Sequence, residues 1–540
     1  MASRSILFHD DARERIRRGV ALMAEAVMVT LGPRGRTVIL QREFGPPQVV
    51  NSGVMVARAI ELDDPFENMG AQLVREVAAR TSELAGDGTT TATVLTHAMV
   101  QGGLRYLAGG MNPMGVRRGI ERAVQALVAE LARLARPCAS SQEIAQVAAI
   151  SANNDRSIGE LLAGAIDRVG REGAVSIEDG SGLQSELRVV EGMRFEHGML
   201  SPYFVTDAER QCAVLEEAAI LVAGRRLSTL PELLPLLEAV VKAGRPLLVI
   251  AEEVEGDALA TLVVNTVRGG LRTCAVRSPG FGDRRKAMLQ DIATLTGATV
   301  VGDELGVPLA QAGIDHLGHA RRIEVGKDDT TLIGGAGKPS AIAERVAAIR
   351  HERGQADSDY EREWLDTRIA RLAGGVAVIR VGAATETELK ERRLRVDDAL
   401  HATRAAVQEG IVPGGGVALL RARRVLETLR GDDFDEDCGI RVVARAVEEP
   451  LRRIVANAGE EPSVVLATVL ASEDPAHGYN AASRAYGDLL AMGVIDPARV
   501  TRLALQNAAS IAALILATDC LVASRPSPRE PGLAGPSAEF

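Results

Sequence analysis

Hydrophobic positions in the first quarter of the chain recur at helical spacing. Apolar residues return every three to four positions through residues 13–29, 69–84 and 89–107, with polar residues between them. Such spacing predicts amphipathic helices. Two short apolar runs near Gly and Pro, at residues 38–40 and 49–50, predict strands. This part of the chain is therefore expected to be mostly helical.

The middle of the chain has a different pattern, in which short apolar runs alternate with amphipathic segments. Residues 247–250, 273–276 and 300–301 are continuous apolar runs typical of buried strands. Residues 257–268 and 284–295 lie between them and have helical spacing. Strands that alternate with helices predict an α/β domain with some parallel pairing.

Beyond Gly374-Gly375 the pattern becomes helical again. Residues 386–409 form one long amphipathic run, Gly414-Gly415-Gly416 interrupts it, and helical spacing then continues to about residue 522. Because the two chain ends resemble each other and the middle differs, we expect a helical domain built from both ends with the α/β domain inserted into it. Candidate pivots, each of which is otherwise an ordinary turn residue, are Pro137, Gly192, Gly374, Gly375 and Gly410.

Length, charge and cysteine content narrow the class of protein. The chain has 540 residues, 46% of them hydrophobic, which at roughly 100–200 residues per domain predicts about three globular domains. A net charge of −10 argues against nucleic acid and anionic membranes as partners, since both attract basic surfaces. The five cysteines lie far apart without a C-x-x-C pair, so reduced thiols are expected and no disulfide framework or zinc site. The charged N-terminus lacks a signal-peptide core, and polar residues interrupt the apolar segment 503–522, so a packed helix in a cytoplasmic protein is expected.

One short motif has a composition suited to phosphate. Gly86-Asp87-Gly88-Thr89-Thr90-Thr91 lies at the start of an expected helix. Free N–H groups at a helix start attract anions, Gly allows a phosphate to approach the backbone, and Thr hydroxyls add donors. Asp87 would repel that phosphate unless a cation such as Mg²⁺ bridges them. A plain N-cap formed by Asp and Thr explains the same residues, so the motif alone leaves both interpretations open.

Three further features suit a nucleotide site but also have ordinary explanations. Thr30-Leu31-Gly32-Pro33 is a tight loop that a simple helix C-cap would explain. Gly414-Gly415-Gly416 could let a nucleotide approach the backbone or form a flexible loop. Asp397-Asp398 could orient a water near a phosphate or lie on a solvated helix face. The sequence has no P-loop, no G-x-G-x-x-G after a strand, no H-E-x-x-H and no G-x-S-x-G.

Two expected helices in the middle of the chain have apolar stripes, and an aromatic pair precedes them. Core packing is the default interpretation of such stripes, and an exposed patch that binds other proteins is the alternative. The residues are Leu233, Leu234, Leu237 and Val240, then Leu259, Val263 and Val264, with Tyr203 and Phe204 upstream.

Several long stretches are more specific than any short motif. They include Thr-Leu-Gly-Pro-Arg-Gly-Arg from residue 30, Ala-Gly-Asp-Gly-Thr-Thr-Thr-Ala-Thr-Val-Leu from residue 85, Leu-Ser-Pro-Tyr-Phe from residue 200, Pro-Gly-Phe-Gly-Asp-Arg-Arg-Lys from residue 279, and Gly-Glu-Glu-Pro-Ser-Val-Val from residue 459. In their order and in their residues these stretches resemble the group I chaperonins, the 60 kDa GroEL family. The resemblance covers nearly all of residues 11–520.

That resemblance implies a multidomain α+β fold. A mostly helical equatorial domain would comprise residues 1–136 and 410–523, and a small intermediate domain residues 137–191 and 376–409. An α/β apical domain of residues 192–375 would be inserted between them. The Pro-, Ser- and Gly-rich residues 524–540, which lack the Gly-Gly-Met repeats of the family, are expected to be a disordered tail.

The resemblance also implies an ATP-dependent folding machine that assembles into one or two seven-subunit rings. Its partners would be non-native client proteins and a 10 kDa co-chaperonin, and its cofactors ATP and Mg²⁺, with K⁺ as a further candidate. Asp87 would hold Mg²⁺ and Asp398 would position the hydrolytic water, with Ser52 at the second catalytic position. The implied nucleotide contacts are Thr30, Leu31, Gly32, Pro33, Asn51, Asp87, Gly88, Thr89, Thr90, Thr91, Gly415, Asn480, Ala481, Ala482 and Asp496. The implied client and co-chaperonin surface comprises Met199, Tyr203, Phe204, Leu234, Leu237, Leu259, Val263 and Val264.

Three positions depart from the family pattern. Asn51-Ser52-Gly53 stands where the family has Lys-Asp-Gly, and serine supplies no carboxylate at neutral pH, so slowed ATP hydrolysis is the resulting hypothesis. Met199 replaces a Tyr of the apical surface and stays apolar. His197 replaces an Arg that pairs with Glu386 of a neighbouring subunit, which would make that pair weaker and pH-sensitive.

Two other functions compete with a folding machine. A ring-shaped holdase or scaffold with little turnover would follow if Ser52 prevents hydrolysis. A small-molecule kinase would need an acceptor-substrate pocket, and no residue constellation in the sequence suggests one.

Overall fold

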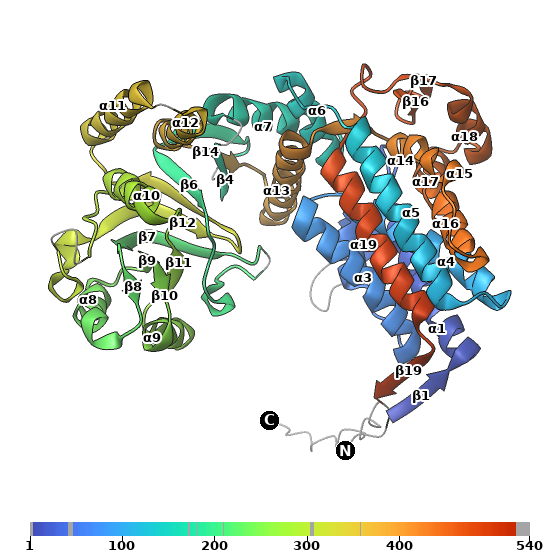
Figure 1. Ribbon diagram of the computed structural model, residues 1–540, viewed down its shortest axis with the longest axis horizontal. Coiled ribbons are helices and arrows are strands. Elements are labelled where there is room, and N and C mark those ends of the chain that lie inside the picture. The colour runs from blue at the N-terminus through green and yellow to red at the C-terminus, as the bar shows by residue number, and fades with distance from the viewer. Residues whose placement is uncertain are drawn as a thin grey trace, which may run out of the picture. The chain divides into compact units, whose positions relative to one another are not determined.

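The protein folds into two compact units. The computed structural model describes residues 4–524 apart from 42–46, 171–172, 181, 209, 303–306 and 357. Unit 1 comprises Met1–Ala163 and Leu394–Phe540, and unit 2 comprises Gly164–Arg393 (Figure 1). The predicted multidomain α+β fold is confirmed. The chain passes between the units inside the two segments predicted as intermediate, and the division into three domains with the stated boundaries stays a prediction.

Unit 1 is mostly helical. Its N-terminal part contains β1 (Arg4–Phe8), α1 (His9–Met28), β2 (Val38–Leu40), β3 (Gln48–Val50), α2 (Gly53–Ala59), α3 (Pro65–Ala85), α4 (Thr89–Ala108), α5 (Pro113–Leu134), α6 (Ser141–Ser151) and the start of α7 (Arg156–Val169). Its C-terminal part contains most of α13 (Glu386–Glu409), then β15 (Ile411–Pro413), α14 (Val417–Ala422), α15 (Val425–Thr428), α16 (Phe434–Ala446), α17 (Glu449–Asn457), α18 (Pro462–Ala471), β16 (His477–Asn480), β17 (Ala485–Asp488), β18 (Ile495–Pro497), α19 (Ala498–Ala517) and β19 (Cys520–Ser524).

The core of unit 1 lies between helices from both chain ends. Apolar faces of α1, α3, α4, α5, α16 and α19 form one buried cluster. Small residues allow close approach: a Cβ on Gly439 would lie 2.1 Å from the carbonyl oxygen of Val116, and one on Gly119 would lie 2.0 Å from that of Glu436. Any larger residue at either position would push α5 and α16 apart.

Helix α19 is long and apolar enough to cross a membrane by length and composition alone. However, 61% of its most apolar stretch is buried inside the protein, against α3, α4 and α5 (Figure 1). It is the packed helix that the interrupted apolar pattern predicted.

The two ends of the described chain pair as strands. β1 and β19 are antiparallel, from Arg4↔Ser524 to Phe8↔Cys520. The expectation that helical spacing continues to residue 522 is therefore wrong at its end, because α19 stops at Ala517 and the pairing edge comes from a distant part of the chain. Ser524, the first residue of the predicted tail, ends β19, and residues 525–540 lie outside the described residues.

Unit 2 is a mixed α/β structure. It contains the end of α7, β4 (Ala174–Asp179), β5 (Glu186–Val190), β6 (Gly192–Glu196), η1 (Pro202–Phe204), β7 (Ala213–Val222), β8 (Arg226–Leu227), α8 (Leu230–Ala243), β9 (Leu247–Ala251), β10 (Glu253–Val254), α9 (Gly256–Val267), β11 (Thr273–Arg277), α10 (Gly282–Thr296), η2 (Leu309–Gln311), η3 (Ile314–His316), β12 (Gly318–Val325), β13 (Asp329–Gly335), α11 (Pro339–Gln355), α12 (Asp359–Ala373), β14 (Val376–Val381) and the start of α13.

A six-stranded sheet in the order β11-β9-β7-β12-β13-β6 organises unit 2. β7, β9 and β11 are parallel, as the alternation of strands and helices predicted, whereas β12, β13 and β6 are antiparallel. A second sheet has the order β4-β14-β5. The strand expected at residues 300–301 is only an isolated bridge between Ala223 and Val301.

Candidate nucleotide-binding site

The turn between α3 and α4 presents an uncapped helix start. Gly86 and Gly88 both have left-handed backbones, with φ of 72° and 82°, which favour glycine. Gly86 has no room for a side chain either, since its Cβ would lie 2.1 Å from the Cβ of His401. The N-cap of α4 is Gly88, which has no side chain to form a capping hydrogen bond, so the first N–H groups at Thr89, Thr90 and Thr91 remain available to an anion.

Three half-buried carboxyl groups gather beside this turn. Burial raises the pKa of Asp87, against a 2.5 Å hydrogen bond donated by the Gly88 N–H. Burial, then the charges of Asp87 and Asp397, raise the pKa of Asp398 well above its ordinary value. Burial and Asp87 raise the pKa of Asp496 to about 7, against a backbone hydrogen bond from Gly415. Asp87 therefore acts on both other carboxyl groups, and the protein alone supplies too little positive charge to offset them.

This set of donors fits a Mg²⁺ ion that is shared with a phosphate. Within the described ranges, no group of three or more His, Cys, Asp or Glu side chains lies close enough to enclose a metal by itself. Mg²⁺ is usually held by one or two carboxylates, with phosphate and water completing its shell. A cation at Asp87 would also offset the negative charge that helps raise the pKa values of Asp398 and Asp496. Asp87 is the residue that would hold it.

A second wall of the site joins α2, α4 and the loop after α1. Ser52 precedes the first residue of α2, and its side chain makes no capping hydrogen bond. A Cβ on Gly53 would lie 2.2 Å from the Thr90 Oγ1, so α2 begins directly against the start of α4. The hydroxyls of Thr30 and Thr90 lie 3.4 Å apart. Ser52 thus starts a helix that touches the predicted phosphate cradle.

The loop of Thr30, Leu31, Gly32 and Pro33 is held from its far side. The Asn457 side chain donates to the carbonyl oxygens of Met28 and Leu31, at 3.0 and 2.9 Å. Gly32 and Pro33 are exposed, and Gly32 has a φ of 85°. Arg34 donates to the carbonyl oxygens of Ala481 and Ala482, at 3.0 and 3.1 Å. These bonds place the first loop beside the hairpin that carries Ala481 and Ala482.

The last predicted contacts lie on neighbouring strands and turns. β15 and β18 pair with Val412 opposite Asp496, so the turn of Gly415 after β15 lies next to Asp496. Gly415 has a φ of 65° and lies near the carbonyl oxygen of Tyr479, the residue before Asn480. The Asn480 side chain accepts from the N–H of Ala482 at 3.0 Å and so rigidifies its own turn.

The end of α6 adds residues that the sequence did not single out. Ser151 is close enough to Asp87 to oppose the rise in its pKa, yet its buried Oγ has no hydrogen-bond partner of good geometry. The Asn153 side chain donates to the Asn51 Oδ1 at 3.3 Å, and Asn153 has a left-handed φ of 58°. Two successive Asn residues after a helix predict a left-handed C-cap, but nothing in that local pattern points to a nucleotide.

Comparison with known proteins agrees with the family that the order of the motifs indicated. The family model described as the TCP-1/cpn60 chaperonin family matches residues 23–526. The chain belongs to the TCP-1/cpn60 chaperonin family. It is 72% identical over 528 residues to Chaperonin GroEL 1 of Polaromonas naphthalenivorans, covering 98% of this chain and 97% of that protein. It is 70% identical over 540 residues to Chaperonin GroEL 2 of Albidiferax ferrireducens, covering 100% and 99%.

The predicted client surface of this chaperonin chain is only partly exposed. α9 contacts both α8 and η1, so the predicted residues lie on adjoining elements of unit 2. Tyr203, Leu234 and Val264 are exposed to 67%, 43% and 44%. Met199, Leu259 and Val263 are half-buried. Phe204 and Leu237 are buried in the core at 0% and 5% exposure, which corrects the surface expected from sequence: helical spacing locates a stripe but does not say which of its edges faces solvent.

His197 of the chaperonin chain occupies a strained backbone position in unit 2. Its φ is 126°, unusual for a residue other than glycine. Its N–H donates to the Asp328 carbonyl at 2.8 Å, and its carbonyl accepts from the Thr330 hydroxyl at 2.8 Å. Burial, then Arg277, lower the pKa of His197. Glu386, its predicted partner in a neighbouring subunit, is highly exposed and pairs with Lys390 at 2.8 Å within the same chain.

Proposed function

We propose that the protein is an ATP-dependent molecular chaperone that captures non-native proteins and releases them for refolding. The observation that supports this most is the cluster of Asp87, Asp398 and Asp496 beside the uncapped start of α4. A protein gains nothing in stability from three carboxyl groups whose pKa values burial raises, two of them raised further by the charge of Asp87. The names of the two GroEL relatives support the same function.

Nucleotide would bind by its phosphates at the start of α4. The free N–H groups of the first turn and the Thr89, Thr90 and Thr91 hydroxyls would take the phosphate oxygens. Asp87 would hold Mg²⁺, which when bound neutralises charge between phosphates. Gly415, Asp496 and the Asn480 turn would take the nucleoside. K⁺ is a further candidate near the Thr30 and Thr90 hydroxyls.

Hydrolysis would depend on Asp398. Its carboxyl group, half-buried and close to Asp87, would lose its proton when a cation binds nearby, because the repulsion that raises its pKa would then be offset. The resulting carboxylate would orient the attacking water. Ser52 offers a hydroxyl but no charge, so it would contribute less to this step than an acidic residue would.

Clients would be captured by burial of apolar surface on unit 2. Tyr203, Leu234 and Val264 are the most exposed predicted residues, and the half-buried Leu259 and Val263 adjoin them. A 10 kDa co-chaperonin would compete for the same surface. Seven-subunit rings, single or double, would enclose the client, and we place the protein in the cytoplasm.

The proposal is tested with the purified oligomer, a chemically denatured client enzyme, ATP and a co-chaperonin. We expect ATP hydrolysis, rings by electron microscopy, and recovery of client activity that requires ATP. Absence of ATP-dependent refolding in a protein that forms rings and binds nucleotide would contradict the proposal and leave the holdase alternative. The full-length similarity to GroEL chaperonins does not favour that alternative.

A further inference from the structure

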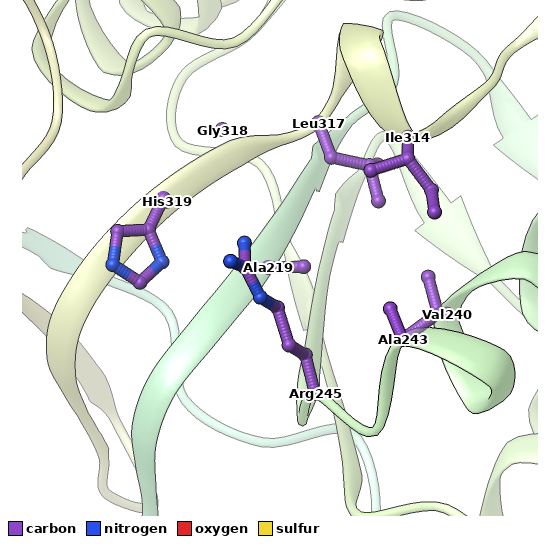
Figure 2. Close-up of a pocket in the computed structure, with 8 residues that line it drawn as sticks. All are labelled: Ala219, Val240, Ala243, Arg245, Ile314, Leu317, Gly318 and His319. Carbon is purple, nitrogen blue, oxygen red and sulfur yellow. The ribbon is translucent and has the colours of Figure 1, made fainter.

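A cavity in unit 2 shares no lining residue with the predicted client surface or with the candidate nucleotide-binding site. It has a volume of about 50 Å³ and lies between the end of α8, η3 and the paired strands β7 and β12 (Figure 2). A single water needs at least about 10–15 Å³ of such space, so the cavity holds about three to four waters or a branched group of about four carbons. Its lining residues are Ala219, Val240, Ala243, Arg245, Ile314, Leu317, Gly318 and His319.

One end of the cavity is apolar. Val240 and Ala243 line it from the last turns of α8, and Ile314 and Leu317 line it from the segment before β12 (Figure 2). Ile314 is 45% exposed although it is a large aliphatic residue. An aliphatic group inserted here would cover that surface and gain roughly 25 cal/mol for each Å² removed from water.

The other end of the cavity is cationic. The ring nitrogens of His319 lie 3.1 Å from the Ala218 carbonyl and 3.0 Å from a carboxylate oxygen of Glu217. Glu217 has a left-handed φ of 50° inside β7, and the ladder to β12 is interrupted at this residue. Glu217 and the Ala218 carbonyl therefore already occupy both ring nitrogens of His319.

Arg245 is different from His319. It is exposed, and with the residues that the structure describes it makes neither a hydrogen bond nor an ion pair. A guanidinium group without a partner, beside an apolar cavity, is suited to a carboxylate, which it can bind through two parallel hydrogen bonds.

We propose that this cavity binds a short branched aliphatic carboxylate. The branched carbon chain lies between α8 and the Ile314–Leu317 segment, and the carboxylate lies at the mouth against Arg245. The carbonyl groups at the end of α8, near Gly244, disfavour an anion deeper in the cavity, so the charge stays at the mouth. Two sources share this chemistry: a free short-chain acid, or the C-terminal Leu, Ile or Val of a polypeptide.

The test is a saturation-transfer NMR titration of the purified full-length protein with 4-methylpentanoate and with its amide. We expect saturable binding of the acid and at least roughly tenfold weaker binding of the amide. Arg245→Gln should weaken the binding of the acid by at least roughly tenfold. Ala243→Leu, which fills the apolar end of the cavity, should weaken the binding of both compounds. Arg272→Gln, which removes an exposed arginine that does not line the cavity, should leave the binding of both compounds unchanged.

Equal binding of acid and amide, equal binding by Arg245→Gln and the unchanged protein, or no saturable binding would each overturn the proposal. Acetyl-Gly-Leu and its C-terminal amide distinguish the two sources. Binding of the acetylated peptide acid supports a polypeptide terminus as ligand, and binding of 4-methylpentanoate alone supports a free acid. None of these measurements depends on ATP, so their outcome is separate from that of the proposed chaperone function.

Discussion

Replacing Asp496 by Asn should make the ligand-free protein more stable at neutral and alkaline pH. Burial and the charge of Asp87 raise the pKa of Asp496 to about 7 in the folded protein. In the unfolded chain the pKa returns to about 3.9. Between these values the folded protein keeps a proton that the unfolded chain has lost. The free energy of unfolding therefore falls as the pH rises from about 4 to about 7, and it stays low above that.

The size of this effect follows from the shift. A difference of about three pKa units, at about 1.4 kcal/mol for each unit, gives an upper bound of about 4 kcal/mol. The carboxyl group is only half-buried, so solvent screens it, and we expect about 1–2 kcal/mol. Asparagine keeps the shape and the hydrogen bond from Gly415 but cannot ionise. The substitution should remove the pH-dependent loss of unfolding free energy. At pH values above 7 it should raise Tm by about a few degrees.

The assay is thermal unfolding at one fixed protein concentration, without nucleotide and with a chelator, from about pH 5 to about pH 8. The matched control is Asp63→Asn, at an exposed aspartate of the same unit. The difference in Tm between Asp496→Asn and the unchanged protein should increase as the pH rises. The difference in Tm between the control and the unchanged protein should stay the same at every pH. A difference in Tm between Asp496→Asn and the unchanged protein that is constant with pH, or that increases as the pH falls, would refute the reasoning.

Three further predictions concern catalysis, metal and client binding. Ser52→Asp should raise steady-state ATP hydrolysis while Ser52→Ala leaves it unchanged, because only the former adds a carboxylate, and equal rates in both variants would exclude a role for charge at this position. Removing Mg²⁺ with a chelator should weaken ATP binding by at least roughly tenfold in a fluorescence titration, and ATP binding by Asp87→Asn should not respond to the chelator. If the variant keeps the full metal dependence of ATP binding, Asp87 is not the metal ligand. Leu234→Ala should weaken capture of a denatured client with little change in stability, whereas Leu237→Ala, in the core, should cost about 2–5 kcal/mol of unfolding free energy; the reverse pattern would contradict the burial of these two residues.

Elements that depend on local periodicity were predicted well. The helix at residues 386–409 has those bounds in the structure, and the helix that starts at Thr89 does so too. Gly86 and Gly88 adopt left-handed backbones where the phosphate interpretation needs close approach. The spacing of apolar residues and the backbone freedom of glycine act within a few residues. A short segment of the sequence is therefore enough to predict these elements.

Features that depend on distant partners were not predicted. Strand β19 exists because β1 provides its edge, and Val301 bridges to Ala223 without extending a strand. Phe204 is in the core although its neighbour Tyr203 is exposed. Burial is decided by what packs against a residue, and that partner lies elsewhere in the chain.

By itself the sequence determined the family, the helical ends with an inserted α/β unit, and a Gly- and Thr-rich turn before a helix, whose composition suits a phosphate. Only the tertiary structure decided that Asp87, Asp398 and Asp496, which come from three separate elements, lie close enough for the charge of Asp87 to raise the pKa of the other two. It also decided that Ser151 adjoins Asp87 and that Asn153 contacts Asn51. The reason is physical: hydrogen-bonding geometry and periodicity are properties of neighbouring residues, whereas burial and repulsion between charges arise only when the folded chain brings distant segments within a few ångströms.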